Sequence, residues 1–529
     1  GLPGITCVET LYQLDKNLSI GLITCSDTVI YFDYLIIGGG IAGITCVETL
    51  YQLDKNLSIG LITCSDTVKS VTNLKRITKL IEDFTVIDQS FDELSKNISK
   101  LTLLKAEVQY INSKSKFVKL NNHKEVFYSE LCICTGGKPK LIEYNNELVV
   151  GIRDTDSVVI FKEKLMGKLF CCKRVAIVGN GGIATELVFE LVDCELVWII
   201  KDKYISANFF DAAAGKFLLN TLDDPQLADR GAGKIDIQRH HFDIDGRNYT
   251  VERKGLNRDK SPFGGALGPD WARNTTMRGC GERKLEVRYE VEISQIETDT
   301  NSICELWKKE NPSDRSCCSY NVALTLTDGS VEFCDLVVSA TGVRPQFPHL
   351  IDADWDISET DGGILVKDTM ATNVTGIYAA GDCCTANWQC SEHWFQMRLW
   401  NQARLMGFQA AKTMHASRHI LPEPLADFGF ELFTHVTKFF GYSVVLLGLY
   451  NGQKLQLENN ENAELIIRTC PGVEYIKCVV VDGRIRGAIL IGDTEMAETL
   501  EDLILDQLDI SVHGEFLLDP NLDIVDYFD

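Results

Sequence analysis

The stretch FDYLIIGGGIAG, residues 32–43, joins a buried-strand pattern directly to a glycine loop, and a helix pattern follows it. Its glycines match G-x-G-x-x-G in the strand–turn–helix setting that a dinucleotide-binding α/β unit requires. Gly38 permits the tight turn, Gly40 lets a pyrophosphate approach the backbone, and Gly43 lets the helix pack closely on the strand. The free N–H groups of the helix N-terminus favour phosphate there, so we predict a dinucleotide site at this loop.

One usual feature of such a unit is absent. An acidic residue about 20 positions further on commonly holds the ribose hydroxyls. Here the second strand, expected over residues 58–63, runs into Cys64 and Ser65, with Asp66 slightly beyond. We expect hydroxyl contacts to take the place of the carboxylate.

A second unit of the same kind begins with the strand pattern at residues 174–178. The loop GNGGIATE follows at residues 179–186, and its glycines Gly179, Gly181 and Gly182 precede another helix pattern. The next predicted strand ends at Lys201, where a cation would accommodate the 2′-phosphate of NADPH. A solvated loop lysine is an equally good interpretation of Lys201.

Two further segments, one before and one after the second unit, repeat each other, and a third closes the pattern. Buried-strand patterns run into TGGKP at residues 135–139 and into TGVRP at residues 341–345. The segment IYAAGD, residues 377–382, places Asp382 just past a strand, where a carboxylate can bind the sugar-like chain of a cofactor. Two glycine units, each with a matching closing strand, predict an α/β fold with two Rossmann-like dinucleotide-binding domains.

Along the chain the five motifs follow in the order GGGIAG, TGGKP, GNGGIATE, TGVRP and IYAAGD. In this order they resemble the pyridine nucleotide-disulfide oxidoreductases, a family of two-dinucleotide-binding-domain flavoproteins. The resemblance covers about residues 32–420, and further stretches (151–157, 266–271, 396–400, 435–440 and 523–529) are similar to one member of the family. It implies FAD and NAD(P)H as cofactors. It also implies that FAD is bound by Gly38, Gly40, Gly43 and Asp382, flanked by Thr135 and Gly136, and that NAD(P)H is bound by Gly179, Gly181 and Gly182.

The resemblance also implies two catalytic positions. Glu186 matches a family glutamate near the junction of nicotinamide and flavin, although an acid in the first turns of a helix is also favoured by the helix dipole. Lys69, which we place in a turn over residues 69–73, would lie near the flavin.

Disulfide reductases of this family carry a cysteine or cysteine pair soon after the first nucleotide unit. This chain has no cysteine between Cys64 and Cys132. Because dithiol exchange needs a thiolate beside the flavin, we do not expect a direct disulfide reductase. The adjacent pair Cys383 and Cys384, next to Asp382, is the remaining candidate for such chemistry.

We therefore predict an FAD-dependent NAD(P)H oxidoreductase that passes hydride to flavin and then reduces oxygen, a quinone-like molecule or a protein acceptor. An alternative is a flavin- and NAD(P)H-binding redox sensor that regulates a partner with little turnover. The resemblance further implies protection from oxidative stress, a cytoplasmic and nuclear location, and association with a tRNA-splicing ligase complex.

The composition of the chain argues against nucleic acid, a membrane and metal ions as further partners. The 529 residues carry 75 acidic and 52 basic side chains, a net charge of −23, which disfavours direct nucleic-acid binding. No apolar run reaches the roughly 20 residues that a membrane helix needs. The 19 cysteines follow no disulfide framework, and the histidines show no H-x-x-E pattern, so we expect no metal site.

The FAD domain is expected to be interrupted by the NAD(P) domain. The expected units are a duplicated stub at 1–30, FAD-binding parts at 31–150 and 341–424, an NAD(P)H-binding domain at 151–340 with an insertion at about 205–330, and a C-terminal α/β domain at 425–529. Residues 4–29 repeat residues 43–68 letter for letter, which we interpret as an artefact. Residues 230–288 are locally basic, which indicates a solvated insertion or a docking surface for an acidic or RNA-associated partner.

Overall fold

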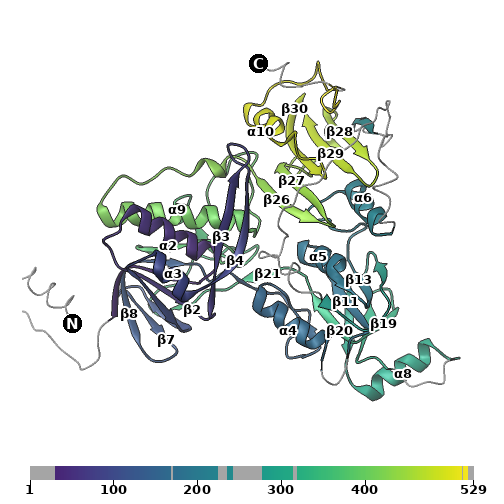
Figure 1. Ribbon diagram of the computed structural model, residues 1–529, viewed down its shortest axis with the longest axis horizontal. Helices are drawn as coiled ribbons and strands as arrows, with labels where there is room; N and C mark the ends of the chain where they lie inside the picture. Colours follow the sequence, from purple (N-terminus) through teal and green to yellow (C-terminus); the bar gives the residue numbers. More distant parts are fainter. Residues whose placement is uncertain are drawn as a thin grey trace, which may run out of the picture.

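A computed structural model describes residues 30–167, 171–223, 235–241, 277–313, 319–514 and 516–521 (Figure 1). The duplicated residues 4–29, the closing residues 523–529 and residues 242–276 of the predicted insertion lie outside this part. Three bodies are visible: one around α2 (Ile41–Leu53) and α9 (Trp400–His419), one around α4 (Thr155–Leu165), α5 (Gly182–Glu190) and β11 (Arg174–Val178), and one formed by the late strands with α10 (Ala497–Asp506).

The first body contains both predicted FAD-binding parts. Its elements are β1 (Ile30–Ile37), α2 (Ile41–Leu53), β2 (Ile59–Thr63), β3 (Thr67–Arg76), β4 (Glu82–Ser90), α3 (Phe91–Asn97), β5 (Leu101–Lys105), β6 (Val108–Asn112), β7 (Phe117–Leu120), β8 (Glu125–Ile133), β22 (His349–Leu350), β23 (Ile364–Val366), β24 (Ile377–Ala379), β25 (Cys384–Ala386) and α9 (Trp400–His419).

Its main sheet has the order β22-β6-β7-β8-β1-β2-β5, and β24 pairs with β8. β1 lies parallel to both β2 and β8, so the strand before the glycine loop is central and fully covered. Such burial on both faces explains why residues 34–37 are all apolar. The parallel pairing of β24 with β8 brings Asp382 back to the sheet edge that carries the glycine loop.

The second body contains the second glycine unit. Its elements are β10 (Val149–Val150), α4 (Thr155–Leu165), β11 (Arg174–Val178), α5 (Gly182–Glu190), β12 (Leu191–Val192), β13 (Glu195–Ile199), β15 (Met277–Arg278), β16 (Lys284–Arg288), β17 (Ile293–Glu297), α8 (Thr300–Glu310), β18 (Val322–Leu326), β19 (Val331–Cys334) and β20 (Leu336–Ser339). Between β13 and β15, α6 (Ala212–Asp223) leaves this body and packs on the late strands, where Phe217 contacts Tyr442 and Tyr475 (Figure 1).

A parallel sheet of order β10-β20-β11-β13-β16 forms its centre. The two repeated segments of the sequence meet here: β9 (Gly137–Pro139) pairs antiparallel with β21 (Val343–Pro345). TGGKP and TGVRP therefore form the two crossings between the first and second bodies.

The third body is a six-stranded sheet of order β14-β28-β29-β30-β27-β26. Its elements are η1 (Phe428–Phe430), β26 (Thr434–Phe439), β27 (Tyr442–Gly448), η2 (Leu457–Asn459), β28 (Ala463–Cys470), β29 (Glu474–Val481), β30 (Arg484–Ile491) and α10 (Ala497–Asp506), joined by β14 (Asp236–His241). β14 belongs to the stretch for which we considered a solvated insertion, yet it pairs antiparallel with β28. β14 covers an edge of β28 that would otherwise be unpaired. A solvated insertion is therefore the wrong interpretation for the residues of β14.

The turn predicted over residues 69–73 is also wrong. These residues belong to β3, which pairs antiparallel with β4, Val71 facing Val86 and Thr72 facing Thr85. β-branched residues at facing positions favour a strand over a turn. The tip of this hairpin reaches the third body, where Ile81 is buried in its core.

The described cysteines are free thiols, and most of them are buried. They act there as small apolar side chains. Within the described part of the chain, no helix combines the length and the apolar character needed to cross a bilayer.

Acid should weaken the third body through His435. Burial on β26 lowers the pKa of His435 to about 4, against about 6.5 in an unfolded chain. As the pH falls through this window, the unfolded chain binds a proton that the folded chain does not bind. The stability contributed by neutral His435 is therefore present above about pH 6.5 and is lost below it, by about 1.4 kcal/mol per pH unit.

Thermal unfolding at about pH 7 and about pH 5 should show a smaller loss of stability in acid for His435→Phe than for the wild type. In His123→Asn, which changes an exposed turn histidine, the loss should equal that of the wild type; equal losses in all three would contradict the assignment.

Candidate active site

A cavity of about 1980 Å³ lies between the first and second bodies. The glycine loops at residues 38–40 and 179–182 both open into it. Parallel α/β sheets place their ligands beyond the carboxyl ends of the strands, and both loops follow such ends, of β1 and β11. The cavity can therefore hold two ligands that meet.

The first loop has the geometry of a phosphate cradle. Gly38 has φ +117°, and a Cβ there would lie 2.1 Å from the carbonyl oxygen of Cys134. A Cβ on Gly43 would lie 2.0 Å from the carbonyl oxygen of Gly38. A Cβ on Gly40 would meet nothing within 4 Å. Gly38 is thus fixed by packing against the end of β8 and Gly43 by packing within the loop, whereas Gly40 faces open space that fits a pyrophosphate.

No side chain caps α2 at Gly40, which is its N-cap residue. The first N–H groups of a helix need a partner. An anionic ligand in the adjoining cavity supplies that partner and is favoured by the helix dipole. The residues present therefore fit the phosphates of a dinucleotide.

The second loop repeats this arrangement. Gly179 has φ +127°, and the nearest atom to a Cβ on Gly181 would be Nδ2 of Asn208, at 3.7 Å. Gly181 is the N-cap residue of α5 and again offers no side-chain cap. Asn180 donates to Asp202 across 2.8 Å. This bond fixes the end of the loop against the segment that follows β13.

Lys201, just after β13, is exposed and lines the cavity beside Asp202. A cation and a carboxylate thus stand together where the ribose of the second ligand is expected. This placement agrees with both interpretations of Lys201.

Thr135 and Gly136 lie where the chain crosses toward the second body. The Thr135 hydroxyl donates to the carbonyl of Gln346, and the Gln346 N–H donates to the carbonyl of Gly136 across 3.0 Å. Gly136 has φ +67°, and a Cβ there would lie 2.2 Å from Nη2 of Arg153. The guanidinium of Arg153 therefore lies directly on the backbone of this crossing.

Asp382 lies in the cavity wall between two arginines. Its carboxylate is 3.7 Å from Nη2 of Arg153, and its carbonyl accepts from Nε of Arg398 across 3.0 Å. Burial raises the pKa of Asp382, while Arg153 and Arg398 lower it. About a fifth of the side chain stays exposed, so the carboxylate can accept hydrogen bonds from a ligand.

Lys69 joins the first loop to the second body. Its backbone N–H donates to the carbonyl of Gly39 across 2.9 Å. Its ammonium is held between the carboxylate of Asp88 and the hydroxyl of Thr155. With only 14% of the side chain exposed, Lys69 presents a positioned cation in the cavity wall.

Glu186 differs from Lys69 and Asp382 in its position relative to the cavity. It lies half-buried on α5 and is not among the described residues that line the cavity. Its predicted catalytic role therefore gains no support from position and stays a prediction.

Sequence reasoning missed four residues that organise the site: Arg153, Arg398, Asp88 and Thr155. Arg153 and Thr155 belong to the stretch GIRDTDS, in which Asp154 and Ser157 form a capping box for α4. That capping signal is readable in the sequence. It locates a helix start, but it does not show that the neighbouring arginine covers Gly136.

The thiols of the cavity wall are Cys64 and Cys134 among the described residues. Cys64 follows β2, at the position expected for ribose contacts, and burial raises its pKa. Cys134 is buried with its pKa raised well above the usual value by its hydrogen bond with Cys132 and by burial. Cys383 and Cys384 have no exposed surface and do not line the cavity. No pair of accessible thiols faces the cavity in the described part of the chain.

Comparison with protein families gives two matches. The family described as pyridine nucleotide-disulphide oxidoreductase matches residues 32–226 and 274–407. The family described as rubredoxin NAD+ reductase C-terminal domain matches residues 438–508, within the third body.

Among curated proteins, the chain is 42% identical over 505 residues to pyridine nucleotide-disulfide oxidoreductase domain-containing protein 1 of Homo sapiens, covering 94% of this chain and 98% of that protein. The resemblance found in the sequence is thereby confirmed.

Two solved structures show the same fold. A covalent putidaredoxin reductase–putidaredoxin complex matches with TM-score 0.58 and 14% identity, covering 94% of this chain and 98% of that chain. NADH:rubredoxin oxidoreductase from Clostridium acetobutylicum matches with TM-score 0.53 and 17% identity, covering 91% and 97%. The predicted α/β fold class, with dinucleotide-binding domains and a C-terminal domain, is confirmed.

Proposed function

This chain belongs to the pyridine nucleotide-disulphide oxidoreductase family, and from that premise we propose that it moves electrons from NAD(P)H through FAD to a small electron-carrier protein, without a thiol relay. FAD and NAD(P)H are its cofactors. The observation that carries the proposal is that both glycine loops open into one cavity without an accessible thiol pair among its described lining residues.

The residues that we assign to FAD are Gly38, Gly40, Gly43, Thr135, Gly136 and Asp382. The residues that we assign to NAD(P)H are Gly179, Gly181, Gly182 and Lys201. When bound, FAD supplies a two-electron acceptor for hydride from the nicotinamide. The chain supplies backbone N–H groups for both pyrophosphates and a carboxylate from Asp382.

Lys69 is the side chain that we propose to act on the reacting end of the flavin. Its charge is fixed by Asp88 and Thr155 before any ligand enters. A preorganised cation of this kind stabilises negative charge that develops on a ligand without reorganising at that moment.

We expect Lys69→Met to keep FAD but to slow its reduction by NAD(P)H about 10- to 100-fold, because the positioned charge is lost. Stopped-flow absorbance under anaerobic conditions measures this rate. Lys105→Met is the matched control, since Lys105 pairs with Asp66 on the exposed surface and should react like the wild type. A Lys69→Met rate equal to that of the wild type would remove Lys69 from the catalytic set.

We infer the class of electron acceptor from the third body. Its match is to the C-terminal domain of a rubredoxin reductase, and one structural neighbour is a reductase joined to its electron-carrier protein, putidaredoxin. Oxygen and a quinone-like molecule remain the other acceptors that we predicted. Disulfide reduction at Cys383 and Cys384 is disfavoured, because both thiols are fully buried in the core of the first body.

The redox-sensor alternative uses the same site with little turnover. A role in oxidative stress protection, a cytoplasmic and nuclear location and a tRNA-splicing ligase partner remain predictions from the resemblance, as do the domain boundaries.

Anaerobic addition of NADH and, separately, NADPH to the FAD-loaded chain separates the enzyme from the sensor. The proposal predicts rapid bleaching of the flavin absorbance, followed by repeated NAD(P)H oxidation when an electron-carrier protein such as rubredoxin, or a quinone, is added. A reduced complex that persists in the presence of every acceptor would instead support the sensor.

A further inference from the structure

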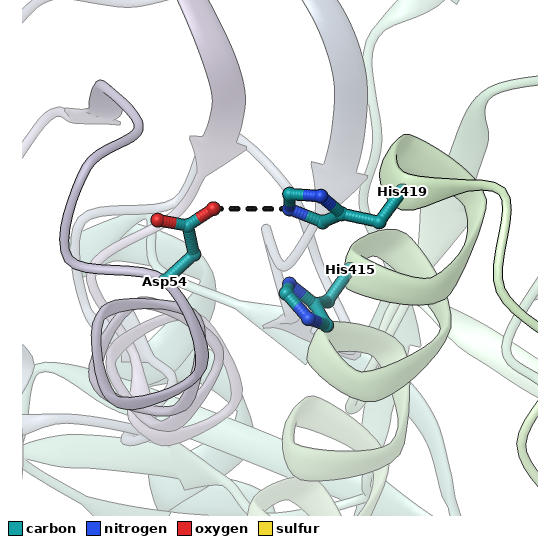
Figure 2. Close-up of side chains that lie close together, drawn as sticks. All are labelled: Asp54, His415 and His419. Carbon is teal, nitrogen blue, oxygen red and sulfur yellow. Dashed lines mark hydrogen bonds and ion pairs between the residues drawn. The ribbon is translucent and has the colours of Figure 1, made fainter.

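Three potential metal ligands lie together at the ends of two helices (Figure 2). The two helices are far apart in the sequence. Asp54 directly follows α2, and His415 and His419 lie in the last turns of α9. One ligand atom from each of the three lies within 4.8 Å of the others. Nε2 of His419 is 3.0 Å from Oδ2 of Asp54.

Close packing of α2 on α9 brings these groups together. A Cβ on Gly407 would lie 2.2 Å from the carbonyl oxygen of Ala42, and Sγ of Cys46 lies 3.9 Å from Sδ of Met414. Positions i and i+4 share one face of a helix, so both histidines project toward the end of α2. The arrangement is thus fixed by the core of the first body.

The ligands are partly preorganised. The backbone N–H of Asn56 donates to Oδ1 of Asp54 across 2.8 Å, which leaves Oδ2 to face the histidines.

An ion pair alone does not account for the whole cluster. The contact between His419 and Asp54 accounts for those two side chains only. It leaves His415 unexplained, because the Nδ1 atom of His415 is buried and has no hydrogen-bond partner. Buried polar atoms are rarely left in that state.

We propose that Asp54, His415 and His419 bind a divalent transition-metal ion, with Zn²⁺ the best match. Two imidazole nitrogens and one carboxylate oxygen form a ligand set that Zn²⁺ commonly takes, and a water molecule can complete the tetrahedron. A pair of histidines at i and i+4 of one helix is a recurrent half of such sites. The site departs from our expectation, from the sequence, of no metal.

The bound ion would act as a cross-link rather than at the reaction. It ties the C-terminal ends of α2 and α9, whose N-terminal ends reach the cavity at Ile41 and Trp400. A 13-residue helix spans about 20 Å, so the ion lies well away from the cavity. Its expected effect is on the stability of the first body.

Calorimetric titration of the full chain with ZnCl₂ tests the site. Exposed thiols at Cys64, Cys171 and Cys280 are first alkylated with N-ethylmaleimide, because thiolates also bind Zn²⁺. We expect His415→Ala to lose one equivalent of Zn²⁺, or to bind it at least about 100-fold more weakly, since even outer-shell changes cost 10- to 100-fold. His123→Asn should bind as the wild type does.

A second variant keeps the test independent of folding. Asp54→Asn retains the shape of the side chain and removes its charge, and it should also weaken that equivalent of Zn²⁺. The melting temperature should rise with Zn²⁺ in the wild type and in His123→Asn, and not in Asp54→Asn. Zn²⁺ binding that is absent in the wild type, or unchanged in both site variants, would overturn the proposal.

Discussion

Gly40→Ala should yield a folded chain that has lost FAD. A Cβ at this position meets no protein atom within 4 Å, so the fold tolerates it. It enters the open space to which we assign the pyrophosphate, where the backbone N–H groups at the start of α2 require close approach. We expect FAD affinity to fall at least about 100-fold, which corresponds to about 2.7 kcal/mol.

The matched variant in the second loop is Gly181→Ala, where the nearest atom to the new Cβ is 3.7 Å away. It should keep the flavin and raise the NAD(P)H concentration needed for half-maximal flavin reduction. Flavin content after gel filtration and anaerobic titration measure the two effects, with circular dichroism as the check on folding. If both variants lost the same cofactor, our assignment of the two loops would be wrong.

Gly43→Ala should prevent folding rather than remove a ligand. The added Cβ would lie 2.0 Å from the carbonyl oxygen of Gly38 and 3.1 Å from its carbonyl carbon. Both contacts are to backbone, so no side-chain rotation relieves them. Ordinary overpacking costs about 1–3 kcal/mol, and we expect this contact to cost at least the upper value.

The measurements are soluble yield and thermal unfolding by circular dichroism, each compared with Gly40→Ala in the same helix region. FAD should not rescue Gly43→Ala, because the clash is within the protein. A folded Gly43→Ala chain with the melting temperature of Gly40→Ala would contradict the close packing of α2 on the loop after β1.

The parts of the fold that local pattern controls were predictable. Both glycine loops are bounded by buried parallel strands, whose apolar runs read directly from the sequence. β3 was missed because we placed a turn over residues 69–73, whereas the pairing of Val71 and Thr72 with β4 makes this segment a strand. β14 was missed because its partner β28 lies more than 200 residues later in the chain.

The candidate site also contains residues that local sequence predicts and residues that depend on contacts between distant segments. Glycine positions follow from backbone geometry and were readable, whereas Arg153, Asp88 and Arg398 act through contacts between distant segments. Asp54 and His419 are 365 positions apart. The i, i+4 histidine spacing was present in the sequence, but its third ligand was not visible without the packing of α2 on α9.

A reductive titration decides whether two cofactors meet in one cavity with no thiol relay between them. The FAD-loaded full chain is titrated with NADH or NADPH in the absence of oxygen while its flavin absorbance is followed. FAD takes two electrons and a redox-active disulfide would take two more. We predict complete flavin reduction by one equivalent of nucleotide per FAD. Consumption of two equivalents, or a chain that takes up no FAD, would contradict the account.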